Sequence, residues 1–129
     1  MKKGFIINIE KETRDNSDFR RVLYTSCYMQ LVVMSLDVGE EIGSEVHGLD
    51  QFIRVEQGEG VVVLNGETTP LREDEAVVIP AGTEHNVINT GNQALKLYTI
   101  YAPPEHQDGI IQARKEDAFE EHYDGKTTE

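Results

Sequence analysis

Short clusters of aliphatic, often β-branched residues recur along the chain, and Gly, Pro, Asn or Asp separates each cluster from the next. Val, Ile and Thr favour the pleated backbone of a β-strand, whereas Gly, Pro, Asn and Asp favour turns. The pattern predicts an all-β sandwich or barrel with little helix. The expected strands are residues 5–9, 21–25, 30–36, 51–56, 60–64, 68–71, 76–79, 85–89 and 95–101.

The segments between the strands indicate one tight hairpin and two short helices. Asn65-Gly66 is the strongest turn signal, because both residues accept the positive φ angles of the type I′ turn that joins antiparallel strands. Residues 10–18 lack the alternation of a strand and are expected to hold a short helix. Residues 109–123 follow Pro104, which cannot continue a central strand, and are expected to form a short C-terminal helix.

The charge of the chain excludes several classes of partner. Its 129 residues include 12 Lys and Arg against 24 Asp and Glu, so the formal net charge is −12. Nucleic acid and anionic lipid would be repelled, and no aliphatic run approaches the roughly 20 residues that cross a bilayer. The length fits one domain, and Cys27, as a single cysteine, cannot form an internal disulfide. We therefore expect a single-domain, cytoplasmic protein that binds neither nucleic acid nor membranes.

A polar constellation surrounds the first of two informative histidines. Alternate residues of a strand point to the same side of a sheet, so Glu45 and His47 share a face, and Gln51 joins them if the turn between them keeps the parity. Ile53 and Val55 continue that face with aliphatic side chains, whereas the residues between them are charged. The face that carries the three polar residues is therefore expected to point into the interior.

The second histidine follows a Pro-x-Gly turn at residues 80–82, which starts a strand whose inward face would carry His85 and Asn89. An unpaired polar group inside a protein costs roughly 1–3 kcal/mol in mutational series, and a bound cation would satisfy several such groups at once. We expect Asn89 to be structural rather than a ligand. The predicted metal ligands are Glu45, His47, Gln51 and His85.

These two segments resemble the signature motifs of the cupin superfamily, G-x5-H-x-H-x3,4-E-x6-G and G-x5-P-x-G-x2-H-x3-N. The first motif falls on residues 39–58 and the second on residues 74–89, and their metal-binding positions correspond to the four ligands named above. Glu45 replaces a histidine of the commonest pattern, Gln51 replaces a glutamate and Asp74 replaces a glycine. The replacements at ligand positions shift the donor set from nitrogen toward oxygen.

The resemblance implies an all-β, double-stranded β-helix, the jelly-roll barrel of cupins, here with a short C-terminal helix. It implies one cupin domain over residues 1–129, with a motif core at about residues 36–101, an N-terminal arm at residues 1–20 and a C-terminal extension at residues 103–129. It also implies one divalent transition metal (Mn, Fe, Co, Ni or Zn) inside the barrel. A small-molecule ligand would lie beside this metal.

Cupins carry out many reactions, so the resemblance indicates a fold more closely than an activity. The leading hypothesis is a metal-dependent isomerase or dioxygenase acting on a small oxygenated or sugar-like substrate. A non-catalytic module that binds or senses a small molecule or a metal is the main alternative. A metal-free, epimerase-like cupin with His47 as base has less support, because such enzymes need basic residues for an anionic nucleotide, and few besides Arg54 and Arg72 lie near the motifs.

Other notable side chains have structural explanations. Tyr98 and Tyr101 lie on opposite faces of the last strand, so at most one faces the interior, and packing accounts for both. His106 and His122 are expected on the surface, although His106 could fold back over the barrel mouth as a proton-transfer group. Phe52 lies on the face opposite the donors, and because cupins commonly pair through such strands, we expect a homodimer.

Overall fold

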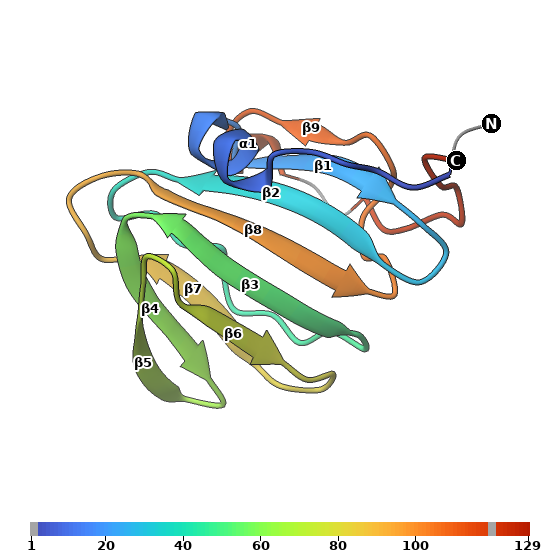
Figure 1. The fold of residues 1–129 in the computed structure, drawn as a ribbon. Coiled ribbons are helices and arrows are strands. Elements are labelled where there is room, and N and C mark those ends of the chain that lie inside the picture. Colours follow the sequence, from blue (N-terminus) through green and yellow to red (C-terminus); the bar gives the residue numbers. More distant parts are fainter. Residues whose placement is uncertain (1–2, 119–120) are drawn as a thin grey trace.

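The computed structural model describes residues 3–118 and 121–129, which form a sandwich of two antiparallel sheets (Figure 1). The larger sheet has the strand order β6-β3-β8-β2-β1-β9, and the smaller has the order β5-β4-β7. The elements are α1 (Ile9–Asp15), β1 (Arg20–Thr25), β2 (Gln30–Leu36), β3 (Asp50–Gln57), β4 (Glu59–Leu64), β5 (Glu67–Arg72), β6 (Ala76–Ile79), β7 (His85–Asn89), β8 (Leu95–Ala102), β9 (Ile111–Gln112) and the single 3₁₀ turn η1 (Lys115–Asp117).

The strands expected from residue 21 onward all form, and their ends differ from the prediction by at most one residue. Asn65 and Gly66 have φ angles of 47° and 83°, as the predicted hairpin between β4 and β5 requires. The short helix expected within residues 10–18 is α1, whose N-terminus is capped by the Asn8 side chain, which accepts a hydrogen bond from the Lys11 amide at 3.1 Å. Within the described residues, no helix is long and apolar enough to span a membrane.

Two expectations for the ends of the chain are wrong. Residues 5–8 form no strand, and the helix α1 begins at Ile9. In the C-terminal extension, β9 and the single turn η1 replace the expected helix, although residues 119–120 lie outside the described part. β9 pairs with β1 and forms an edge of the larger sheet (Figure 1).

The two sheets do not close into the expected barrel. β5 and β6 follow one another in the chain but belong to different sheets. The chain crosses between the sheets at the turn that contains Asp74, whose φ of 65° is in the left-handed region. The two strands are therefore edges of separate sheets instead of hydrogen-bonded neighbours, and the architecture is an open β-sandwich.

The space between the sheets is apolar at its centre and polar at one end. On β8, Leu95, Leu97, Thr99 and Tyr101 alternate as buried residues, and on β3 the predicted inward face of Gln51, Ile53 and Val55 is buried as well. The register places Gln51 opposite Tyr101 and Val55 opposite Leu97. The parity prediction for β3 is therefore confirmed, and it directs Gln51 to the polar end.

Asn89 is a structural residue, as predicted. Only 2% of it is exposed, and its side-chain nitrogen donates to the carbonyl oxygens of Leu36, Asp37 and Gln93 at 3.0–3.1 Å. Its Oδ1 accepts from the Gly91 amide at 3.0 Å. The side chain thus links the end of β2 to the loop between β7 and β8. Its role is to hold the backbone together rather than to bind a metal.

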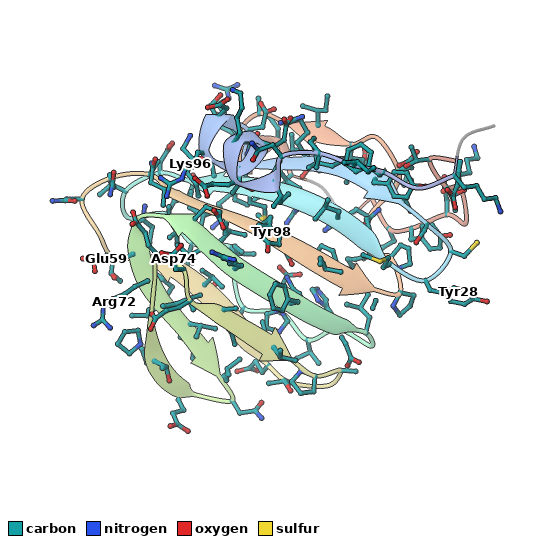
Figure 2. All side chains as sticks on the ribbon, viewed as in Figure 1. Tyr28, Glu59, Arg72, Asp74, Lys96 and Tyr98 are labelled. Atoms are coloured by element: carbon teal, nitrogen blue, oxygen red, sulfur yellow. The ribbon has the colours of Figure 1, made fainter. Side chains whose placement is uncertain are left out.

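The outer face of β8 carries Lys96 and Tyr98 (Figure 2). Lys96 Nζ donates to the carbonyl of Asn16, just after α1, at 2.6 Å. The half-buried Phe52 of β3 lies beside Tyr98, with ring centroids 6.2 Å apart. Phe52 is therefore on the face opposite the donors, as expected, and the homodimer through this face stays a prediction.

Candidate functional site

The two predicted ligand segments meet at the polar end of the sandwich. The amide of Glu45 donates to the His85 carbonyl and the amide of His85 donates to the Glu45 carbonyl, both at 2.9 Å. This antiparallel bridge holds the segment before β3 alongside β7. The rings of His47 and His85 consequently lie 5.0 Å apart between centroids, and the ring of Tyr101 lies 6.1 Å from that of His47.

Glu45 and His47 form a hydrogen-bonded ion pair, with 2.7 Å between Oε2 of the carboxylate and Nε2 of the ring. Burial alone would raise the pKa of Glu45, but the hydrogen bond from His47 and the nearby positive charges outweigh it and lower that pKa. The same hydrogen bond raises the pKa of His47 against the opposing effect of burial. Both shifts favour a carboxylate paired with an imidazolium.

The ring orientation of His85 is set by the backbone of its own turn. His85 Nδ1 lies 2.9 Å from the carbonyl oxygen of Thr83. A carbonyl oxygen can only accept, so Nδ1 carries the proton and, in the neutral ring, Nε2 has the lone pair. This is the arrangement that metal-binding histidines adopt when a second group orients them. His85 is only 5% exposed.

Gln51 is also held in place, and one of its polar atoms has no partner. Its Nε2 donates to Thr99 Oγ1 at 3.0 Å, and the residue is 4% exposed. Within the described part of the chain, Gln51 Oε1 and His47 Nδ1 are buried without a hydrogen-bond partner. A buried acceptor left in this state costs about 1–3 kcal/mol. A cation beside Gln51 would remove that cost.

The four donors are close together but are not arranged around a common point. Among residues 3–118 and 121–129, no group of three or more His, Cys, Asp or Glu side chains is placed so that it could hold a metal ion. Glu45 and His47 bind each other instead. The donor types nevertheless fit a first-row transition metal, since two imidazoles, a carboxylate and an amide oxygen are available. The unsatisfied Oε1 of Gln51 supports this fit, and a metal would have to displace the Glu45–His47 hydrogen bond.

A cavity of about 480 Å³ is lined by two of these donors, Glu45 and His47, but not by Gln51 or His85. A second cavity of about 550 Å³ contains none of the four histidines, and it therefore offers less chemistry. The polar residues that line the cavity beside the donors are Arg20, Ser44, Glu45, His47, Glu105, His106, Lys115, Glu121 and His122.

Arg20 is the residue of this cavity that the sequence reasoning missed. It begins β1, in which Arg20 and Val22 are buried and the residue between them is half-buried. Its Nη1 donates to Gln112 Oε1 of β9 at 2.8 Å. The sequence did contain a signal for Arg20. Arg20 and Val22 are two residues apart in a strand and so point the same way, and a basic residue on an inward face is unusual.

His106 lies against the site, so its expected place as an exposed loop residue is wrong. It is half-buried, and its ring packs edge-on against Tyr101 with centroids 5.1 Å apart. Burial and the positive charge of Arg20 lower the pKa of His106 to about 3, and burial raises the pKa of Tyr101 to about 12. His122 is exposed as expected, with its Nδ1 3.1 Å from Oε1 of Glu105.

Replacing His106 by Gln is expected to make the protein less sensitive to acid. The pKa of His106 is about 3 in the folded state, whereas an unfolded histidine titrates near about 6.5. The neutral His106 therefore contributes stability that is complete above the unfolded pKa and is lost as the pH falls toward the folded one. Urea unfolding at about pH 7 and about pH 4.5 should show a smaller loss in His106→Gln than in the wild type. Equal losses would contradict a buried neutral ring, and the exposed His122→Gln is the matched control.

Comparison with known proteins relates the chain to one family and to several solved structures. The family model described as "Cupin domain" matches residues 32–101. The uncharacterized protein YrkC of Bacillus subtilis is 48% identical over 123 residues, which cover 90% of this chain and 66% of that relative. A crystal structure from Bacillus halodurans is 48% identical, with a TM-score of 0.88, and the match covers 89% of this chain and 92% of that one.

A more distant structure carries a description of an activity. It is a Thermotoga maritima protein described as a predicted oxalate decarboxylase, 26% identical, with a TM-score of 0.57. The match covers 60% of this chain and 68% of that one. The chain also spans slightly less than two thirds of the length of YrkC.

Proposed function

The chain belongs to the cupin domain family, and from this membership we propose that it is a metal-dependent enzyme acting on a small oxygenated substrate, of the isomerase or dioxygenase type. One observation carries the proposal. The buried Oε1 of Gln51 has no hydrogen-bond partner among the described residues, although it lies at the polar end of the sandwich where Glu45, His47 and His85 also lie. A divalent cation is the ligand that all four residue types share.

The residues of the site have separate tasks in this proposal. Glu45, His47, Gln51 and His85 hold the metal, which when bound supplies a Lewis acid that polarises a substrate oxygen. The Thr83 carbonyl and the Thr99 hydroxyl orient His85 and Gln51. The neutral His106 contributes a ring nitrogen, Nε2, that is buried without a partner and can hold a proton or a hydrogen bond at the cavity wall.

A non-catalytic binding or sensing module is the second candidate. The 2.7 Å hydrogen bond between Glu45 Oε2 and His47 Nε2 gives the carboxylate a partner in the absence of a cation, which suits a cavity that binds a small molecule alone. The description of the Thermotoga maritima relative favours the enzyme instead, since it names a reaction on a small, oxygen-rich acid.

Metal analysis tests the proposal. Protein purified without added metal, or reloaded after chelation, is expected to contain about one divalent ion per chain. A metal at about 100 times its dissociation constant stabilises the folded state by about 2.7 kcal/mol, so chelation should lower the melting temperature by several degrees and reloading should restore it. Elemental analysis and thermal melts make these measurements.

The outcomes separate the candidates. A chain that takes up no metal and melts identically with and without chelator overturns the metal site. A metal-loaded protein that shows neither oxygen uptake nor isomer exchange across a panel of small hydroxy acids, keto acids and sugars would identify a binding module.

A further inference from the structure

Arg20 carries a buried positive charge that forms no ion pair with a carboxylate of the described residues. The residue is only 7% exposed, and within residues 3–118 and 121–129 no carboxylate oxygen lies within 4.0 Å of its guanidinium. Its direct contacts are with neutral groups: Nη1 donates to Gln112 Oε1, the guanidinium interacts with the Tyr101 hydroxyl, and its carbon lies 5.1 Å above the centre of the Phe19 ring. Its Nε is buried without a partner. Buried arginines are almost always paired, because an isolated charge is costly away from water.

The acidic residues near Arg20 are engaged elsewhere. Arg20 lines the same cavity as the metal-site residues Glu45 and His47. The Glu45 carboxylate binds His47 at 2.7 Å, and the Glu105 carboxylate lies 3.1 Å from the His122 ring. Both carboxylates therefore have a histidine partner, whereas the buried Nε of Arg20 has no partner.

Arg20 is buried, unlike the other charged residues that line the cavity. Lys115 and Glu121, for example, are both half-buried. The Arg20 guanidinium is therefore the charge that a ligand would most need to match. A planar carboxylate fits the fork of guanidinium donors and carries one charge, whereas a doubly charged phosphate would also meet the repulsion of the glutamates.

We propose that Arg20 binds the carboxylate of the substrate, so that the substrates are small oxygenated carboxylic acids. This assignment rests on the proposed function, because it takes the cavity beside the metal residues as the substrate site. The acid would place its carboxylate at Arg20 and its second oxygen toward the side of the cavity formed by Glu45 and His47. Arg20 is then a specificity-determining residue contributed by β1, outside both signature motifs.

The test uses metal-free, chelated protein, so that it is independent of metal binding. Glycolate, HO-CH2-COO⁻, is the probe, ethylene glycol is its neutral counterpart, and inorganic phosphate is the competing anion. The wild type is expected to bind glycolate at least about 10-fold more tightly than the other two. Arg20→Met should lose at least about 10-fold of that affinity, because it removes the charge-assisted hydrogen bonds to the carboxylate. Arg72→Met is the matched control, since Arg72 projects from the edge strand β5 and its side chain is 60% exposed (Figure 2).

A second measurement needs no variant of Arg20 to fold. In the wild type, the NMR resonance of the Arg20 Nε–H group should shift on titration with glycolate, while that of Arg72 should not. Three results would overturn the assignment: an Arg20 resonance that does not move, unchanged glycolate affinity in a folded Arg20→Met, or equal binding of phosphate or ethylene glycol. Glycolate binding through Arg20 in a chain that takes up no metal would instead reject the proposed metal function and leave the carboxylate site standing.

Discussion

A His85→Ala variant is expected to bind divalent transition metals at least about 100-fold more weakly than the wild type. Mutation of groups that merely orient a metal ligand typically costs about 10–100-fold in affinity, and His85 is itself a proposed ligand. Because Nδ1 of His85 is hydrogen-bonded to the Thr83 carbonyl, Nε2 is the atom that would bind the metal. Alanine has no atom that can replace this ligand. Titration with Zn²⁺ or Co²⁺ against a competing chelator measures the affinity directly.

The controls separate loss of a ligand from loss of the fold. His47→Ala should show the same loss as His85→Ala. His122→Ala should keep the wild-type affinity, because His122 is exposed and is not among the proposed ligands. Far-ultraviolet circular dichroism establishes that each variant is folded. Full metal content in both His47→Ala and His85→Ala would reject the proposed site.

An Asn89→Asp variant is expected to lose about 3–5 kcal/mol of unfolding free energy. The Asn89 nitrogen donates to the carbonyls of Leu36, Asp37 and Gln93, and an aspartate would place an acceptor against these three acceptors in a buried position. Each carbonyl would lose the Asn89 donor, although the Asp37 carbonyl would still accept from the Glu40 amide. The new carboxylate would have to be protonated or desolvated. Urea unfolding at neutral pH measures the loss.

Asn92→Asp makes the same chemical change at an exposed residue in the loop that follows β7, and it should alter the unfolding free energy by no more than about 0.5 kcal/mol. Similar effects of the two substitutions would mean that overall charge, rather than the buried hydrogen bonds, determines the loss. Metal affinity should be unaffected in a folded Asn89 variant, because Asn89 is not among the proposed ligands.

The alternation of side chains along a strand correctly predicted which residues of β3 and β7 point inward. Gln51, Ile53 and Val55 are buried together because alternate side chains of β3 must face the same way. His85 and Asn89 are buried together on β7 for the same reason. The Asn65-Gly66 turn followed from local backbone preference alone.

Long-range pairing explains the errors. The segment at residues 109–123 has a composition suited to a helix, but the open edge of β1 recruits Ile111 and Gln112 as β9, because unpaired backbone groups of a sheet edge favour a hydrogen-bonded neighbour. Barrel closure also depends on how two sheets meet, and the turn at Asp74 separates β5 from β6. His106 appeared to be a loop residue because nothing within its own segment indicates that Tyr101 and Arg20 lie beside it.

By itself, the sequence determined the β-class of the fold, the positions of most strands, and the inward direction of Gln51 on β3 and His85 on β7, since these follow from interactions between residues a few positions apart. Only the tertiary structure decided which side chains complete the cavity. Arg20, His106 and Gln112 are brought together by contacts between segments far apart in the chain, and their unsatisfied or altered polar groups appear only once water has been excluded. The tertiary structure also decided that Glu45 and His47 bind each other, because side-chain rotamers and the local electric field, rather than spacing, determine which partner a charged group selects.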